Sequence, residues 1–303
     1  PQTAANQLAE TGLVEFAEPY LTFPLLYTPN DPQISGQYAL SIIQAAQAWD
    51  VTKGDSSVVI GIIDSGVEWT HPDLLENVFN NPGESGKDAQ GRDRSSNGVD
   101  DDNNGYVDDI HGWDLVGGPT LQELQNGQFK PDNNPAPVVS SAQNYQGYHG
   151  TWSSGCASAA TDNARGIAGT GFRSKILPVK CTDDSFATGQ VLTALDGIRY
   201  AADMRAKVIN CSFGGEAAAC AGQAYQAVID YAYAKGALVV AASGNFSMNN
   251  DESSVFPANL KRVLSVGAST PQDSAASFTH YGIAVKVYAP GVNILTTQLG
   301  GGY

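Results

Sequence analysis

One short segment restricts the fold of this chain more than any other. Residues 57–63, Ser-Val-Val-Ile-Gly-Ile-Ile, form an almost continuous run of apolar, mostly β-branched residues that ends at Asp64. A strand buried on both faces of a sheet has this composition, whereas a strand with one solvent-exposed face alternates between apolar and polar residues. The run therefore predicts a central strand of a parallel sheet that is covered by helices on both sides.

The same kind of segment recurs along the chain. Four further apolar runs lie at residues 175–180, 207–210, 237–242 and 262–267. Helical segments, most of them rich in alanine, lie at residues 42–49, 188–205 and 221–235. Strand and helix in alternation predict an α/β fold: a three-layer, doubly wound, mostly parallel sheet with right-handed crossovers. Ligands of such sheets bind at the carboxyl ends of the strands.

Composition limits the classes of partner. The chain has 303 residues, of which 42% are hydrophobic, enough for one large domain. Its 16 Lys and Arg against 31 Asp and Glu give a net charge of -15, which argues against nucleic acid or an anionic membrane as partner. No apolar run reaches the roughly 20 residues of a membrane span. We expect any export signal to lie upstream of Pro1.

The four cysteines are too few for a disulfide scaffold in a chain of this size. Cys181 and Cys211 lie in apolar runs and are interpreted as small buried hydrophobic residues. With Cys156 and Cys220 the count is even, so one or two disulfides remain possible.

Three polar residues stand out, each open to more than one interpretation. Asp64, directly after a buried strand, suits a ribose ligand, a metal ligand or a catalytic orienting residue; the ribose interpretation lacks its GxGxxG turn. His149 opens a segment of small residues, and Asn245 follows the apolar run 239–242 and Ser243-Gly244. Taken singly, each of the last two is explained as an ordinary loop or turn residue.

In their order along the chain, these motifs resemble those of the subtilisin-like serine proteases, or subtilases. Asp64-Ser-Gly with His71-Pro-Asp-Leu resembles the first catalytic motif, and His149-Gly-Thr resembles the start of H-G-T-H-x-A-G. The sequence departs from the second motif at Trp152, Ser153 and Ser154. The order Asp, His, Ser is the subtilisin arrangement. The resemblance implies that Asp64 orients the imidazole, that His149 is the general base and that Asn245 donates a hydrogen bond to the oxyanion.

The resemblance also implies that the substrate is a protein or peptide. Residues 208–215 resemble the V-I-N-x-S-x-G-G strand, whose extended backbone pairs with a peptide in β fashion. The substrate-binding residues implied are Ser212, Phe213, Gly214, Ala242, Ser243 and Gly244.

No catalytic serine motif is present. Ala289-Pro-Gly resembles the segment that leads to the G-T-S-M-A motif in the family, but no G-T-S occurs before Tyr303. We therefore expect the nucleophilic serine to lie beyond residue 303 and the 303-residue chain alone to be inactive. The alternative is a catalytically inactive or fragmentary subtilase fold that acts as a binding or structural module. A nucleotide-binding α/β protein is disfavoured because the chain has no glycine-rich phosphate loop.

A long polar segment, residues 80–148, carries a calcium-loop pattern and too few apolar residues for a core. Its D-x-[DN]-x-[DN]-G spacing predicts oxygen ligands from Asp100, Asp102, Asn104 and the carbonyl of Tyr106. His111 stands where a bidentate Glu is usual, so Asp108 or Asp109 is expected to complete the shell. The alternative, a solvated acidic loop, is disfavoured because so many carboxylates repel one another without a cation.

Resemblance to the thermitase-like branch implies a second calcium site. Residues 27–32 and 43–50 resemble the start of the mature enzymes of that branch. The ligands implied are Asp31, Asp73 and the loop residues Ala160, Asn163, Arg165 and Ile167, with Arg165 contributing only its backbone carbonyl.

The first 26 residues differ from the rest of the chain. Val14–Pro19 resembles the final strand of an inhibitory propeptide, so residues 1–26 are interpreted as a propeptide remnant and 27–303 as an incomplete catalytic domain. We expect a secreted zymogen, inhibited by its own propeptide, that is cut after Leu26, with Leu26 in the first specificity pocket and Phe23 in the fourth. The alternative is an unprocessed hydrophobic linker.

Overall fold

The computed structural model describes residues 2–19, 27–138, 145–184, 190–216 and 223–303. Its centre is a seven-stranded sheet in which all the paired strands are parallel. The strand order is β2 (Trp113–Asp114), β3 (Lys175–Lys180), β1 (Val59–Asp64), β4 (Val208–Cys211), β6 (Leu238–Ala242), β8 (Val263–Ser269) and β9 (Val287–Pro290). A small antiparallel pair, β5 (Gly215–Glu216) and β7 (Val255–Phe256), lies beside it. The structure confirms the expected α/β fold.

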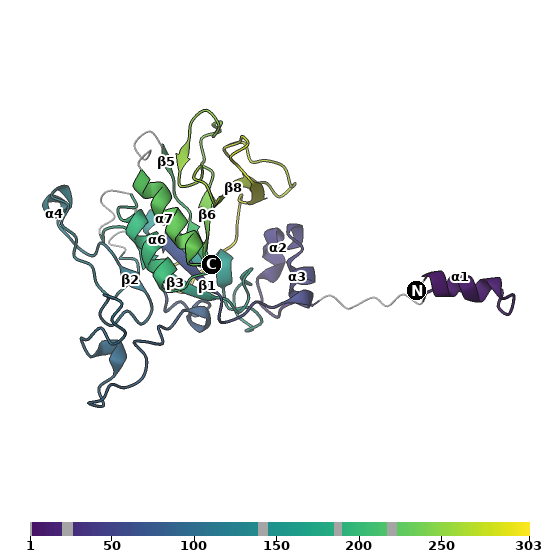
Figure 1. Cartoon of the computed structure of the whole chain (residues 1–303), viewed down its shortest axis with the longest axis horizontal. Helices are drawn as coiled ribbons and strands as arrows, with labels where there is room; N and C mark the ends of the chain where they lie inside the picture. Colours follow the sequence, from purple (N-terminus) through teal and green to yellow (C-terminus); the bar gives the residue numbers. More distant parts are fainter. Residues whose placement is uncertain (1, 20–26, 139–144, 185–189, 217–222) are drawn as a thin grey trace.

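Helices cover both faces of the sheet. Helices α6 (Ala194–Asp203) and α7 (Gln223–Ala234) contact each other and pack on one face (Figure 1). Successive residues of β1 point to opposite faces: Ile63 joins the core beneath α6 and α7, whereas Ile62 joins a second core with Ala159, which directly follows α5 (His149–Ser158). Both isoleucines are fully buried, which explains why this strand shows no polar alternation.

The remaining helices are short. They are α1 (Gln2–Glu10), α2 (Tyr38–Ile42), α3 (Ala45–Val51), α4 (Leu121–Gln125) and the 3-10 turns Ile34–Gly36, Leu75–Asn77, Arg94–Ser96 and Tyr145–Tyr148. The single helix expected over residues 42–49 is wrong: Gln44, with φ 55°, breaks it into α2 and α3.

The polar segment 80–148 contributes more to the core than its composition predicts. Its strand β2 adds an edge to the main sheet, and Tyr106 and Trp113 pack against the core beneath α6. The two rings also contact each other edge to face, with centroids 5.1 Å apart. A few aromatic side chains therefore anchor an otherwise polar segment.

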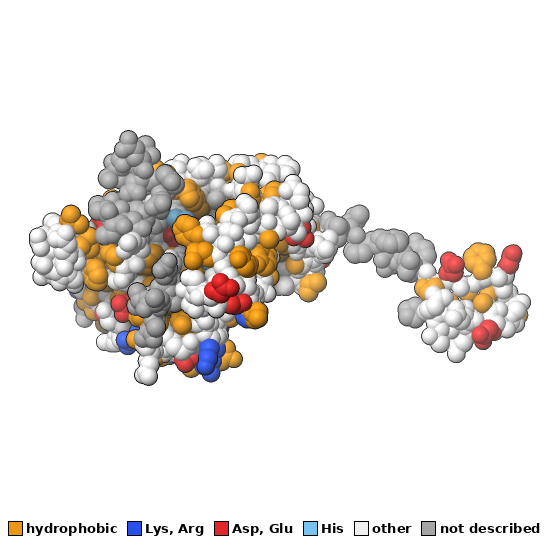
Figure 2. Space-filling model, turned by 90° about the horizontal axis from the view of Figure 1, so that it is seen from above, with side chains coloured by type: hydrophobic (Ala, Val, Ile, Leu, Met, Phe, Trp, Pro, Cys, Tyr) orange, Lys and Arg blue, Asp and Glu red, His pale blue; other side chains and the backbone are white. Residues whose placement is uncertain are grey.

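The N-terminal residues lie apart from the main body in both Figure 1 and Figure 2. Within the described part of the chain, the hydrogen bonds of residues 2–19 are internal. The strand expected over Val14–Pro19 is absent, because no described segment lies beside it to complete a ladder. None of the described helices has the length and apolarity needed to span a bilayer. Lys and Arg are few and scattered on the face in Figure 2, in keeping with the acidic composition.

Three of the four cysteines are described, and all are free thiols. Cys181 and Cys211 are buried, as expected, whereas Cys156 lies on α5 and is exposed. No disulfide joins any two of these three residues in the structure. Cys220 lies outside the described residues.

Candidate active site

The side chains of Asp64 and His149 meet at the carboxyl end of β1. The Nδ1 atom of His149 lies 2.9 Å from both carboxylate oxygens of Asp64. A carboxylate can only accept, so Nδ1 carries the proton and the neutral ring has its lone pair on Nε2. Among the described residues, no side chain forms a hydrogen bond with Nε2. Nε2 is therefore free to accept a proton from a reacting group.

Small residues allow this approach. A Cβ atom at Gly150 would lie 2.1 Å from the carbonyl oxygen of Gly66, so only glycine lets α5 begin against the turn that follows β1. Ser65 ties the two segments together, since its hydroxyl accepts from the Gly150 amide at 3.1 Å and donates to the Gly147 carbonyl at 3.1 Å. The motif residues next to Asp64 and His149 thus fix the backbone beneath the pair.

Asp64 sets the electrostatics of the pair. Its side chain is 5% exposed, and it accepts a hydrogen bond from the Ser65 amide at 2.7 Å. Its negative charge raises the pKa of His149 above the usual value, and partial burial of the ring opposes this effect. Ser153, one helical turn after His149, adds a contact of 3.4 Å to Asp64. The altered residue after the His-Gly-Thr motif therefore supports the carboxylate.

Asn245 lies beyond the carboxyl end of β6, in the wall of a cavity of about 250 Å³. The wall also includes four of the predicted substrate-binding residues, namely Ser212, Ala242, Ser243 and Gly244. Phe213 and Gly214 continue the chain from Ser212 toward β5. The Asn245 side chain is exposed and forms no hydrogen bond with the described residues.

A larger cavity of about 840 Å³ lies beside His149. Its walls include Trp152 and Cys156 of α5, Ser212 after β4 and Leu295 near the end of the chain. The imidazole of His149 thus lines a cavity that is large enough to receive a segment of polypeptide chain.

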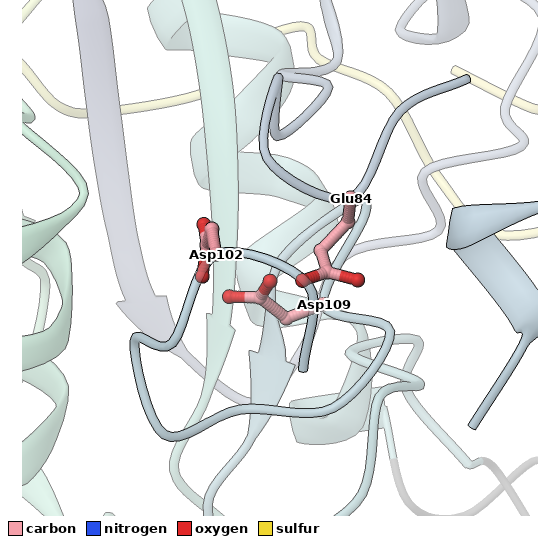
Figure 3. Close-up of side chains that lie close together, drawn as sticks. All are labelled: Glu84, Asp102 and Asp109. Atoms are coloured by element: carbon pink, nitrogen blue, oxygen red, sulfur yellow. The ribbon is translucent and has the colours of Figure 1, made fainter. Parts of the chain in front are cut away.

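Three carboxylates gather near the calcium-loop pattern. Ligand atoms of Glu84, Asp102 and Asp109 lie within 4.8 Å of one another, and Figure 3 shows their side chains converging. Burial raises the pKa of Asp109 to about 6, and the nearby Asp102 carboxylate adds to the effect. The Oε2 atom of Glu84 is buried without a hydrogen-bond partner among the described residues. A divalent cation fits this donor set, because it would satisfy that oxygen and relieve the repulsion.

The other residues predicted as calcium ligands form hydrogen bonds within the loop. Asp100 accepts hydrogen bonds from the amides of Asn104 and Gly105, and Asp108 accepts from the Gly98 amide at 3.1 Å. The amide of Tyr106 donates to the Asn104 side chain at 2.8 Å. The structure therefore does not bring Asp100 or Asp108 into the cluster of three carboxylates.

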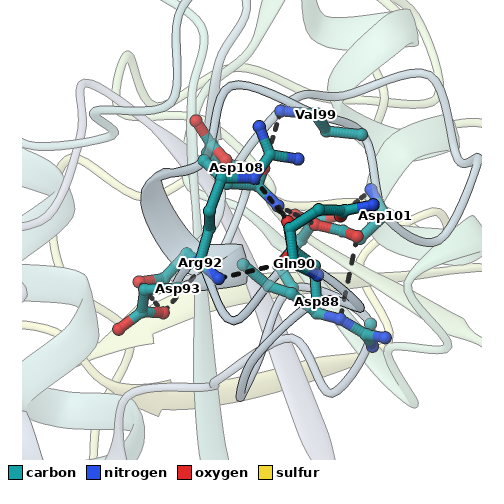
Figure 4. Close-up of polar contacts among 12 residues, drawn as sticks. Asp88, Gln90, Arg92, Asp93, Val99, Asp101 and Asp108 are labelled. Atoms are coloured by element: carbon teal, nitrogen blue, oxygen red, sulfur yellow. Dashed lines mark hydrogen bonds and ion pairs between the residues drawn. The ribbon is translucent and has the colours of Figure 1, made fainter.

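Ion pairs and hydrogen bonds also connect the calcium loop to the segment before it. Asp88 pairs with Arg92 at 2.7 Å and accepts from Asn97, which also donates to Asp101 (Figure 4). Arg94 lies 3.7 Å from Asp101. Arginines thus lie beside these acidic residues, whereas Glu84 accepts from the Asp101 amide at 2.8 Å but forms no ion pair with the described residues.

The residues of the second predicted calcium site also come together. The Asp31 carboxylate accepts from the Asp162 amide at 2.8 Å, and the Asp73 carboxylate accepts from Asn163 at 2.8 Å and from the Ile167 amide at 3.0 Å. The Ala160 amide donates to the Asp73 carbonyl, and the Arg165 amide to Asn163. Asp31 and Asp73 are buried, which raises both pKa values, and neither forms an ion pair within the described residues. Two buried carboxylates without a cationic partner also suit calcium.

The model of the subtilase family matches residues 55–303. The chain belongs to the subtilase family. It is 35% identical over 303 residues to the thermophilic serine proteinase of Bacillus sp. (strain AK1), which covers all of this chain and 61% of that protein. It is 35% identical over 272 residues to thermitase of Thermoactinomyces vulgaris, covering 89% of this chain and 76% of thermitase. A solved protease of Pseudoalteromonas arctica PAMC 21717 superposes with a TM-score of 0.63 at 25% identity, covering 88% of this chain and 73% of that one.

These relatives confirm the subtilase and thermitase-like resemblance of the motifs. The chain spans 61% of the length of the AK1 proteinase. Sequence reasoning missed Glu84, which comes from outside the calcium-loop spacing, and Ser65, which it treated only as part of a motif. Ser153 could have been found, since it lies four residues after His149 and shares its helical face.

Proposed function

We propose that residues 27–303 form part of the catalytic domain of a secreted, calcium-dependent serine endopeptidase. The observation that carries the proposal is the 2.9 Å contact between His149 Nδ1 and the buried Asp64 carboxylate, in a subtilase chain. Secretion is proposed because relatives of the chain are named extracellular proteases. A module that only binds peptides would not need this pair.

In the proposed reaction, His149 Nε2 takes the proton from a serine hydroxyl as that oxygen attacks the peptide carbonyl. It then gives the proton to the leaving amine. Asp64 holds the ring in the Nδ1-protonated tautomer and stabilises the imidazolium that forms. The reaction therefore needs both the buried carboxylate and the exposed Nε2.

Asn245 is proposed to stabilise the oxyanion. Its amide forms no hydrogen bond with the described residues, so donation to the oxyanion would break no existing contact there. Loss of such a donor typically costs about 2.7–4 kcal/mol in the barrier. Peptide backbone would pair along Ser212, Phe213 and Gly214, with a side chain entering the cavity of about 250 Å³.

We place the nucleophilic serine in a segment outside residues 1–303. Two observations support this placement: no described hydroxyl is hydrogen-bonded to His149 Nε2, and the cavity of about 840 Å³ lies beside it. We accordingly expect no peptidase activity from residues 1–303 alone.

Calcium is proposed to stabilise the fold at two places. Glu84, Asp102 and Asp109 would hold one ion, and Asp31 and Asp73 the other. The second ion would have further ligands from the carbonyls of Ala160, Arg165 and Ile167 and from the side chain of Asn163. A bound calcium ion would supply positive charge that offsets the repulsion among the carboxylates at each site. Residues 1–26 are proposed to be the end of an inhibitory propeptide.

The test is peptide hydrolysis by the full-length protein. His149→Ala should abolish turnover, and Asn245→Ala should lower kcat about 100- to 1,000-fold with little change in KM. Asn126→Ala, an exposed amide at the end of α4, is the matched control and should leave kcat unchanged. Peptide binding without hydrolysis by the unmodified protein would contradict the proposal and favour the inactive binding module.

A further inference from the structure

His280 is a buried histidine that the proposed mechanism does not use. It is 2% exposed, and its segment runs alongside the loop that follows β6 and carries Asn245. The Ser247 amide donates to the Phe278 carbonyl at 2.8 Å, and the Tyr281 amide donates to the Met248 carbonyl at 3.0 Å. The two segments are thus paired by backbone hydrogen bonds.

The imidazole of His280 packs against the residue that precedes Asn245. A Cβ atom at Gly244 would lie 2.4 Å from Cε1 and Nδ1 of the ring. Gly244 also has φ +119°, in the region that favours glycine, and its carbonyl accepts from the His280 amide at 3.0 Å. Both the backbone and the ring of His280 therefore contact Gly244.

Two successive hydrogen bonds connect His280 to Ser243 through Asn250. Asn250 donates its Nδ2 to the Ser243 carbonyl at 2.9 Å, and its Oδ1 lies 2.7 Å from His280 Nδ1. A carbonyl can only accept, so the Asn250 amide nitrogen must face Ser243 and its oxygen must face His280. His280 Nδ1 therefore carries the proton and donates it to Asn250.

The remaining nitrogen of the ring agrees with this assignment. His280 Nε2 is buried and has no hydrogen-bond partner among the described residues, so a proton there would be unsatisfied. Burial lowers the pKa of His280, which keeps the ring neutral at neutral pH. The ring thus acts as a fixed donor.

We propose that His280 is a positioning residue for the oxyanion donor Asn245, acting through the hydrogen bonds from its Nδ1 to Asn250 and from Asn250 to the Ser243 carbonyl. The Asn245 side chain is exposed and forms no hydrogen bond with the described residues, so its position depends on the backbone around it, which includes the two residues before it. His280 contacts one of these directly and holds the other through Asn250. The inference rests on the proposed function, because it assigns a role in the same reaction.

A double-mutant cycle in the full-length protease tests the coupling. His280→Ala should lower kcat about tenfold with KM nearly unchanged, because a small displacement of a catalytic group costs turnover rather than binding. In the Asn245→Ala background the same substitution should change kcat less than about twofold, because the group that it positions is gone. Equal effects in both backgrounds would overturn the inference, since they would mean that His280 acts independently of Asn245.

Two further substitutions separate the hydrogen bond from packing. His280→Asn places an amide nitrogen where Nδ1 was and should restore most of the lost kcat, whereas His280→Phe keeps a ring and should not. Recovery by His280→Phe but not by His280→Asn would overturn the hydrogen-bonded route. Each variant is assayed well below its own Tm, so that a loss of folded protein is not counted as a loss of kcat.

Failure of the proposed function gives a different result. If Asn245→Ala alone leaves kcat unchanged, the oxyanion assignment falls, and the positioning role falls with it. If Asn245→Ala lowers kcat but His280→Ala does not, only the positioning role is wrong.

Discussion

The Nδ1 atom of His149 lies 2.9 Å from each carboxylate oxygen of Asp64, which is 5% exposed, whereas the imidazole is 41% exposed. The interior of the protein therefore holds one edge of the ring while the other edge lines the large cavity. A general base needs this asymmetry, with an orienting group fixed on one side and access to substrate on the other.

Replacing Asp64 by Asn should keep the fold but remove most of the activity. An asparagine side chain can donate as well as accept, so it no longer selects the Nδ1-protonated tautomer of His149. We expect kcat of the full-length protease to fall about 10⁴-fold. Asp230→Asn, an exposed carboxylate on α7 paired with Arg262, is the control and should leave kcat unchanged. A loss of less than about tenfold in Asp64→Asn would show that the tautomer does not depend on this carboxylate.

The activity should depend on pH through His149. Asp64 raises the pKa of the imidazole above 6.5, so kcat/KM should rise with pH through that higher value as the base becomes neutral. The same shift contributes to folding stability at low pH, and that contribution is lost as pH rises through the folded pKa. The fall in kcat/KM at low pH should therefore not be accompanied by a fall in Tm that His149 causes. Measuring kcat/KM and Tm over the same pH range checks this.

Nuclear magnetic resonance can measure the shift directly. The His149 ring should titrate at a lower pH in Asp64→Asn than in the unmodified protein, because the neighbouring negative charge is gone. An unchanged midpoint would mean that Asp64 does not set the pKa of His149.

Much of this site could be predicted from the sequence, because its parts follow local rules. The strand ending at Asp64 and the D-x-D-x-N-G spacing around Asp102 are written within short segments. The role of Glu84 and the contact between His280 and Gly244 could not be predicted. No sequence pattern links Glu84 to the calcium loop or His280 to Gly244. Strand β9 escaped prediction because its residues are half-buried or exposed and it ends in Pro290, unlike a central strand.

Calcium should raise Tm through Glu84 more than through Asp108. A ligand that binds only the folded state stabilises it by about 2.7 kcal/mol at a hundredfold excess over Kd. Glu84→Gln should reduce the gain in Tm that calcium gives over chelator. Asp108→Asn, the matched control, keeps one oxygen to accept from the Gly98 amide and should leave the gain in Tm that calcium gives unchanged. The reverse pattern would show that Asp108, rather than Glu84, holds the ion.

Processing should occur between Leu26 and Tyr27, a bond next to residues outside the described part of the chain. N-terminal sequencing of the mature protein should give Tyr27 as the first residue. The His149→Ala variant should remain uncut because self-cleavage needs the base.

The substrate preference is a separate prediction. A peptide library should favour bulky apolar residues before the scissile bond, since burial of one such side chain contributes about 1.5–3 kcal/mol. A preference for Arg, Lys or Asp there would contradict the expected apolar specificity.

The central claim is that His149 and Asp64 activate a serine that lies outside residues 1–303. Labelling of the active full-length protein with a serine-directed fluorophosphonate, followed by peptide mapping, tests it most directly. We expect a single labelled serine C-terminal to Tyr303 and no label in the His149→Ala variant. A label on a serine within residues 27–303, or hydrolysis that persists without any labelled serine, would contradict the account.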